Sequence, residues 1–139
     1  MNRYQDWLNE AQADLRHARH SLEQGEYNWA CFAAQQAAEK AVKAVHFRVG
    51  QVAWGHSVRA LLEELPEDVQ PAADLIDKAK ILDKHYIPAR YPDAHPAGPA
   101  FRNYAEAEAR QAVDLAQEVL DYCVSACLAA RPSGGSGPA

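Results

Sequence analysis

The sequence predicts an all-α protein, folded as an up-and-down four-helix bundle with one short extra helix and a proline-rich loop before the last helix. Its 139 residues include 28 alanines and no threonine, with nine valines and three isoleucines. Alanine is the strongest helix former and β-branched residues favour strands, so the composition indicates helices. Apolar side chains also recur every three or four residues along several stretches. A chain of this length supports one core, and we expect a single domain over residues 1–130.

The first two helices are predicted over residues 2–23 and 27–49. The larger apolar residues of the first helix follow one stripe, and Gly25 provides its end. The second helix contains no glycine or proline and stops before Gly50. Its buried side is almost entirely small, which lets helix axes approach closely. We therefore expect it to be the central helix, with these residues at the closest crossing: Ala33, Ala37, Ala41 and Ala44.

A short helix and the third long helix follow. The short helix is predicted over residues 57–65, where Ser57 supplies the N-terminal cap and Pro66 the end. The third long helix is predicted over residues 68–85, because apolar residues share one face and Pro71 is tolerated in a first turn.

A proline-rich segment separates this helix from the last one. Residues 87–103 hold four prolines and Gly98, too many breakers for a regular helix. A loop this long in a compact domain is usually functional. The last long helix is predicted over residues 104–130, and the tail, residues 131–139, is expected to be disordered because it consists mainly of Gly, Pro and Ser.

Charge and cysteine usage restrict the class of protein. The net charge of −5 excludes nucleic-acid binding through bulk electrostatics and leaves a local basic pocket open. Three cysteines, Cys31, Cys123 and Cys127, form no CxxC motif, and their odd number argues against disulfides. We expect Cys123 and Cys127, on the apolar stripe of the last helix, to be buried small side chains. Without a leader-like N-terminus or a long apolar run, we expect a cytoplasmic protein that does not enter a membrane.

The side chains best suited to binding or catalysis lie just before and within the proline-rich loop. Arginine suits two-pronged phosphate recognition, and histidine moves protons near neutral pH. Arg90 and His95 are therefore candidates for phosphodiester chemistry. In the alternative interpretation, Arg90 forms an ion pair with Asp93 or Glu39 and only fixes the loop. The cluster comprises Lys84, His85, Tyr86, Arg90, Tyr91, Asp93 and His95.

Five other features have structural interpretations. Glu39 is expected to make an internal ion pair or a polar link to the loop, and His56 to stabilise a turn. The basic run at residues 16–20 is interpreted as a solvated face. His17 and His20 have a spacing that a metal accepts, but no third ligand is suggested, so we predict no metal site. The aromatic residues expected to anchor the core or a dimer interface are Trp7, Trp29, Phe32 and Phe47.

Three segments carry motifs that occur together in a fixed order. They are AQADLRHARHSLEQGEYNWACFAAQQAAEKAVKAV at 11–45, GHSVRALLEEL at 55–65 and LDKHYIPARYPDAHP at 82–96. The AAEKA block, the GHS turn and the YxPxRYPD block in this order resemble the HEPN domain, a small helical family. The resemblance covers residues 7–123.

The resemblance implies a homodimeric helical bundle that brings the loop arginines of two subunits into a shared cleft. Many relatives are encoded beside a minimal nucleotidyltransferase and act with it as a two-component pair, often toxin and antitoxin. Catalytic members are metal-independent ribonucleases with an arginine and a histidine separated by four to six residues, a pattern that Arg90 and His95 match. The chain departs from that pattern in having Tyr91 after the arginine and Ala89 where many relatives have threonine. Its RYPD form resembles a stand-alone branch for which nucleotide binding is the working proposal.

The leading hypothesis is therefore a nucleotide- or RNA-phosphate-binding protein, the helical partner of a nucleotidyltransferase. Lys40, Lys84 and Arg90 would hold phosphates while Tyr86 or Tyr91 stacks on a base, with Asp93 in the same loop.

Two alternatives are kept. In a metal-independent endoribonuclease toxin, His95 would act as general base or acid and Arg90 would stabilise the phosphorane. In a non-catalytic interaction module, the chain would serve only as an adaptor. None of the three hypotheses needs a cofactor.

Overall fold

The computed structural model describes residues 2–130, and every regular element in that range is helical. The predicted all-α fold is confirmed. The predicted disordered tail lies outside the described residues. The α-helices are α1 (Tyr4–Glu23), α2 (Tyr27–Arg48), α3 (Val58–Glu63), α4 (Ala73–Asp83) and α5 (Glu106–Ala129), and the 3₁₀ helices are η1 (Glu67–Val69), η2 (Pro92–Ala94) and η3 (Ala100–Asn103).

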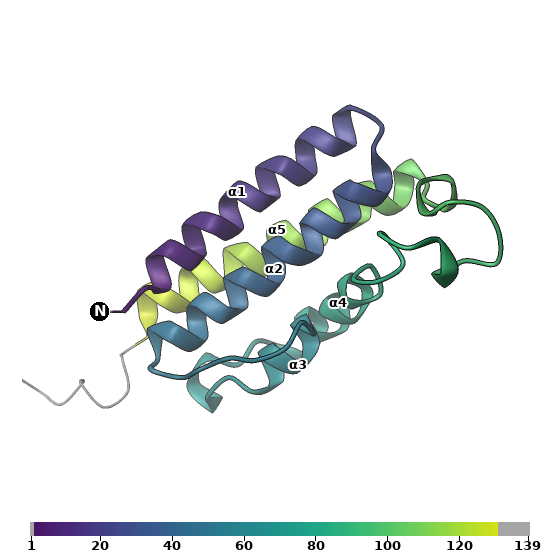
Figure 1. Cartoon of the computed structure of the whole chain (residues 1–139). Coiled ribbons are helices and arrows are strands. Elements are labelled where there is room, and N and C mark those ends of the chain that lie inside the picture. Colours follow the sequence, from purple (N-terminus) through teal and green to yellow (C-terminus); the bar gives the residue numbers. More distant parts are fainter. Residues whose placement is uncertain (1, 131–139) are drawn as a thin grey trace, which may run out of the picture.

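The four longer helices, α1, α2, α4 and α5, run alternately up and down the bundle, and the short α3 lies beside α4 in the opposite direction (Figure 1). Helix α2 packs against each of the other four α-helices, which makes it the central element as predicted. Its alanines explain this position, because Ala33, Ala37, Ala41 and Ala44 are all buried and leave room for neighbours on several sides. None of the described helices is long and apolar enough to cross a membrane.

The third long helix, α4, is shorter than predicted. The expected helix over residues 68–85 is wrong at its start, because η1 ends at Val69 and α4 begins only at Ala73. Gln70 is extended, with φ −75° and ψ 138°. A residue before proline is disfavoured from the α region, so Pro71 separates the two helices instead of lying in a first turn.

Helix α3 is held at its N-terminus by two side chains. The Ser57 hydroxyl accepts a hydrogen bond from the Ala60 N–H at 3.0 Å, which confirms the predicted cap. Asp83, at the end of α4, also accepts the Val58 N–H at 2.6 Å and the Ser57 hydroxyl at 2.8 Å. These bonds fix the start of α3 against the end of α4.

The proline-rich segment is an ordered loop with two short 3₁₀ turns, η2 and η3. Its beginning is fastened to α2 by the buried side chain of Asn28, which donates to the Ala89 carbonyl at 3.0 Å. Its end is fastened by Asn103, whose amide donates to the Ala97 and Pro99 carbonyls. Ala89 is fully buried, so this anchor also fixes the backbone position of the following residue, Arg90.

Candidate functional site

Arg90 lies half-buried in a cradle of aromatic rings. Its guanidinium carbon is 4.5 Å from the centre of the Phe32 ring and 4.6 Å from that of Tyr86. Tyr91 contributes a third ring at 5.2 Å. A guanidinium over an aromatic face is attracted by the electrons of the ring. The Arg90 Nε donates to the Tyr86 carbonyl at 2.8 Å, so both the position and the orientation of the guanidinium are set.

No carboxylate among residues 2–130 forms an ion pair with Arg90. The alternative prediction of a pair with Asp93 or Glu39 is therefore wrong, since Glu39 has other partners and Asp93 is exposed in η2. The terminal nitrogens of the guanidinium carry four N–H donors, and within the described residues none of them has a protein acceptor. The guanidinium is thus positioned by the protein, and its terminal nitrogens have no protein acceptor among the described residues.

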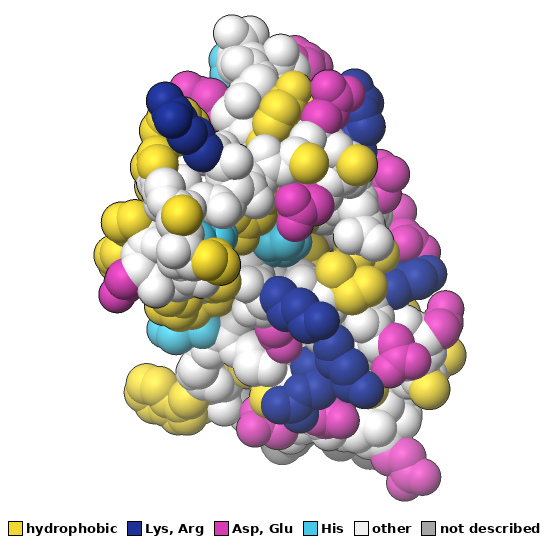
Figure 2. Space-filling model, turned by 90° about the vertical axis from the view of Figure 1, so that its right-hand side faces the viewer, with side chains coloured by type: hydrophobic (Ala, Val, Ile, Leu, Met, Phe, Trp, Pro, Cys, Tyr) yellow, Lys and Arg dark blue, Asp and Glu magenta, His cyan; other side chains and the backbone are white. Residues whose placement is uncertain are grey.

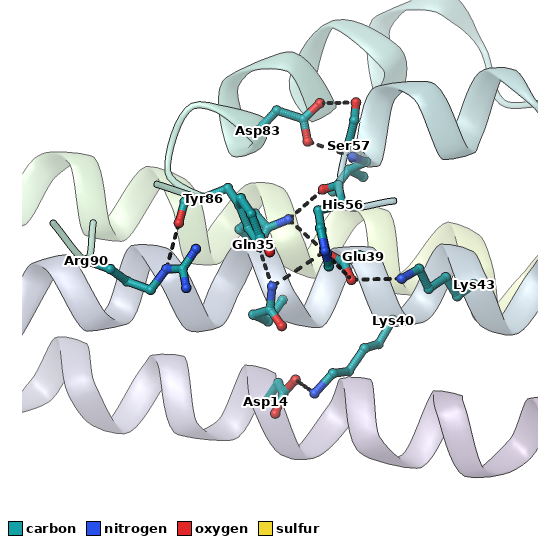
Figure 3. Close-up of polar contacts among 12 residues, drawn as sticks. Asp14, Gln35, Glu39, Lys40, Lys43, His56, Ser57, Asp83, Tyr86 and Arg90 are labelled. Atoms are coloured by element: carbon teal, nitrogen blue, oxygen red, sulfur yellow. Dashed lines mark hydrogen bonds and ion pairs between the residues drawn. The ribbon is translucent and has the colours of Figure 1, made fainter. Parts of the chain in front are cut away.

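A row of stacked and paired side chains extends from Arg90 along α2. Figure 3 shows Tyr86 between Arg90 and His56, with Glu39 and Lys43 beyond. The His56 ring is stacked on Tyr86, with the ring centres 4.6 Å apart and the planes tilted by 16°. His56 Nδ1 then lies 3.1 Å from Glu39 Oε1. The row places two nitrogen-bearing groups, a guanidinium and an imidazole, on either side of one tyrosine ring.

Glu39 is the buried anchor of this row. Its side chain is 5% exposed and pairs with Lys43 at 3.1 Å through Oε2. Gln35 donates to Oε1 at 3.2 Å. The internal ion pair expected for Glu39 is confirmed, but its polar link leads to His56 and not to Arg90. Burial of this polar group is offset by its hydrogen bonds to several donors.

The two tyrosines differ in what they still expose. The faces of Tyr86 are covered by His56 and Arg90, as Figure 3 shows. Tyr91 is 46% exposed and lies at the rim of the cradle. Of the two rings predicted to stack on a base, Tyr91 is the one that is open to a ligand.

Lys84 and His95 line a separate pocket. This cavity, of about 320 Å³, is also lined by His85 and Tyr104. His95 Nε2 is 2.6 Å from the Pro88 carbonyl, so that nitrogen donates and is occupied. The His95 ring packs edge-on against Tyr104. Arg90 is not among the residues that line this pocket, so the loop turns its arginine and its histidine toward different surroundings.

Lys40, another residue predicted to bind phosphate, lies away from the Arg90 cradle. Lys40 Nζ is 2.7 Å from Asp14 Oδ2 of α1, a partly buried ion pair that joins the two helices. The structure does not bring Lys40 into the Arg90 cradle. Residues that sequence reasoning missed are Asn28, which fixes the loop, and the pair of Glu39 and His56.

Burial controls the protonation of several side chains near the loop and in the core. It lowers the pKa of His85, which is 7% exposed, and so favours the neutral imidazole. It raises the pKa of the Cys31 thiol to about 12 and that of Cys127 to about 11. All three cysteines are free and buried, as predicted for Cys123 and Cys127, and their thiols stay protonated near neutral pH.

The aromatic residues expected to be anchors form two pairs at opposite ends of α2. Trp7 and Phe47 have ring centres 5.3 Å apart. Trp29 and Phe32 meet edge to face at 6.1 Å, and Trp29 remains 46% exposed. Because Phe32 also contacts Arg90, this second pair continues the aromatic surface of the cradle outward.

The face of the molecule seen in Figure 2 is mixed in charge. Several lysine and arginine side chains form a cluster that acidic side chains border, others lie apart from it, and histidines are visible above and beside the cluster. This face is not basic throughout. The face therefore does not form a broad basic surface.

Comparison with known proteins assigns the chain to a family. The sequence profile of the HEPN domain matches residues 4–127. This chain belongs to the HEPN family. The crystal structure of TT1696 from Thermus thermophilus is similar, with 60% identity, a TM-score of 0.89, and coverage of 91% of this chain and 99% of that one.

Two further crystal structures extend the similarity of this HEPN domain. ST0689, an archaeal HEPN homologue, is 37% identical with a TM-score of 0.78 and coverage of 91% and 99% of the two chains. An HEPN domain protein from Thermotoga maritima is 44% identical with a TM-score of 0.70 and coverage of 86% and 95%. No curated protein matches the sequence. The resemblance stated from the sequence is confirmed, and the chemistry of the site rests on its own geometry.

Proposed function

We propose that this HEPN domain binds the phosphate of a nucleotide or of RNA at the Arg90 cradle. One observation carries the proposal: the guanidinium is half-buried and held by three aromatic rings and the Tyr86 carbonyl, while no carboxylate of the described chain pairs with it. A fixed, unpaired arginine fork matches two oxygens of a phosphate. The fork is preorganised, so little rotamer entropy is lost when the anion binds.

Tyr91 supports a nucleotide over a free phosphate. Its exposed ring borders the guanidinium at 5.2 Å, which is close enough for one ligand to contact both groups. Stacking of a base on an aromatic ring contributes about 1–3 kcal/mol and tolerates any base. The site therefore supports recognition of a phosphate with a neighbouring base and little selectivity for sequence.

The Arg90→Ala variant tests the site. We expect it to bind a fluorescent single-stranded RNA octamer at least about tenfold more weakly, because a charge-assisted pair of hydrogen bonds is lost. Arg90→Lys should recover only part of the affinity, since it keeps the charge and loses the fork. Arg102→Ala is the matched control, because Arg102 lies on Phe101 in η3 and outside the cradle. Fluorescence anisotropy gives the affinities, and unchanged binding by Arg90→Ala would remove the proposal.

The geometry of one chain does not favour the endoribonuclease alternative. His95 Nε2 is occupied by the Pro88 carbonyl, and the ring lines a pocket that Arg90 does not share. We therefore expect purified protein to leave structured and single-stranded RNA intact in excess EDTA. Cleavage that Arg90→Ala and His95→Ala both abolish would contradict this and establish metal-free chemistry through those two residues.

We also propose that two copies of the chain associate through the aromatic end of α2. Trp29 is 46% exposed beside Phe32, and large aromatic side chains in this setting are typical interface anchors. Association there would place two Arg90 cradles near one shared cleft. Light scattering coupled to size exclusion should give a dimer for the wild type and a monomer for Trp29→Ser. Trp54→Ser is the control, because Trp54 is also exposed but lies in the connection after α2. A wild-type monomer would refute the proposal.

The nucleotidyltransferase partner stays a prediction from the family resemblance.

A further inference from the structure

His56 has an environment that a turn-stabilising residue does not need. Its imidazole is stacked on Tyr86, and Nδ1 faces both Glu39 oxygens, at 3.1 and 3.3 Å. Its side chain is nevertheless 55% exposed. The turn itself is fixed by the neighbouring backbone, because Gln35 donates to the His56 carbonyl at 2.9 Å. The imidazole is thus oriented by a second, independent set of contacts.

These contacts set which nitrogen of the imidazole remains open. Glu39 is buried and accepts from Lys43, so its carboxylate is the acceptor and His56 Nδ1 is the donor. Within the described residues, Nε2 has no protein partner. A protonated imidazole held in this way donates Nε2–H outward while Nδ1–H stays on the carboxylate. His95 shows the opposite arrangement, with Nε2 occupied.

Arg90 and His56 are separated by one aromatic ring. Each group lies 4.6 Å from the centre of Tyr86, on the two sides shown in Figure 3. Two donors held apart by a ring suit two successive anionic groups better than the three oxygens of one phosphate. The Tyr86 ring keeps the spacing rigid, since both of its faces are packed.

We propose that His56 is a second phosphate-contacting residue, positioned by Glu39, and that the ligand carries two phosphates in succession. Arg90 holds the first and the His56 Nε2–H holds the second. This rests on the proposed function of the Arg90 cradle and deepens it by naming the ligand class. Either a nucleoside diphosphate or a 5′-phosphorylated dinucleotide has this chemistry.

The charges around His56 are consistent with this role. From α2 it faces Glu39, whose second oxygen pairs with Lys43. From the loop it faces Tyr86, with Arg90 on the far side of that ring. Asp83 of α4 is engaged with Ser57 and the start of α3, next to His56 in the chain. Among the described residues, the imidazole therefore contacts one carboxylate, that of Glu39.

The test compares AMP, ADP and pApA by isothermal titration calorimetry. For the wild type we expect at least one of the two-phosphate probes to bind about tenfold more tightly than AMP, as an added charge-assisted hydrogen bond predicts. Which probe gains tells whether the phosphates are directly linked or separated by a ribose. His56→Gln should lose the gain and keep the affinity for AMP. His95→Gln is the matched control and should keep both.

A conservative variant of the positioning residue separates contact from structure. Glu39→Gln keeps a hydrogen-bond acceptor for His56 Nδ1 and removes the charge, so it should reduce the gain of the wild type and keep the affinity for AMP. Thermal unfolding of each variant verifies that it is folded.

The outcomes are distinguishable. Equal affinity of the wild type for AMP, ADP and pApA overturns the two-phosphate proposal and leaves the Arg90 site standing. A gain that survives in His56→Gln overturns the role of His56. If Arg90→Ala binds all three probes as the wild type does, the proposed function fails and this inference fails with it.

Discussion

Replacing Ala37 with leucine should lower the free energy of unfolding by about 3 kcal/mol, an effect typical of severe overpacking in a core. Ala37 is completely buried in the middle of α2, and α2 packs on all four other α-helices. A leucine side chain added there can be accommodated only by moving helix axes apart or by leaving preferred rotamers. Because α1 and α5 contact the same helix from different sides, separation on one side loses packing on the other.

Chemical denaturation with urea measures this effect, and the same substitution at Ala107 is the control. Ala107 is an exposed residue of α5, where leucine is also a good helix former. We expect Ala107→Leu to change stability by less than about 0.5 kcal/mol. If the two variants were equally stable, the centre of the bundle would have free space, and the explanation given for the alanines of α2 would be wrong.

The alanine-rich second helix shows why much of the fold was predictable. Its small side chains indicate close packing locally, without reference to any other segment, and the structure confirms a central helix. The prediction for the third helix failed at Pro71, where two local effects of proline compete. Proline is tolerated in a first turn, but its effect on the preceding Gln70 is to favour extended backbone, and that effect prevailed.

The site was predictable only in part. Arg90 and Tyr91 stand out because their loop is rich in functional side chains, and the structure places them together. The partners that orient Arg90 and His56 come from positions far apart in the chain, such as Asn28 on Ala89 and Glu39 on His56. No periodicity reports such contacts. The one available signal was a charged residue, Glu39, on a helix whose neighbours are small and buried.

Removing the Glu39 carboxylate should have the second large effect. Glu39→Ala leaves the Lys43 ammonium, whose side chain is only 12% exposed, without its partner. It also leaves Gln35 without one of its acceptors. Breaking a buried pair by deleting one member costs about 3–5 kcal/mol, because the remaining charge is desolvated and unpaired. We expect a loss of about 3 kcal/mol in urea unfolding, and a loss below about 1 kcal/mol would show that water already screens the pair.

A double replacement separates the stability of this pair from its function. Glu39→Leu combined with Lys43→Met removes both charges and keeps apolar volume, a change that is often neutral for a buried ion pair. We expect the double variant to unfold within about 1 kcal/mol of the wild type. His56 would still stack on Tyr86 but would lose the acceptor of its Nδ1–H. The double variant should therefore bind AMP through Arg90 as the wild type does and lose the tighter binding of a two-phosphate ligand, which would tie that binding to the orientation of His56 and not to the stability of the bundle.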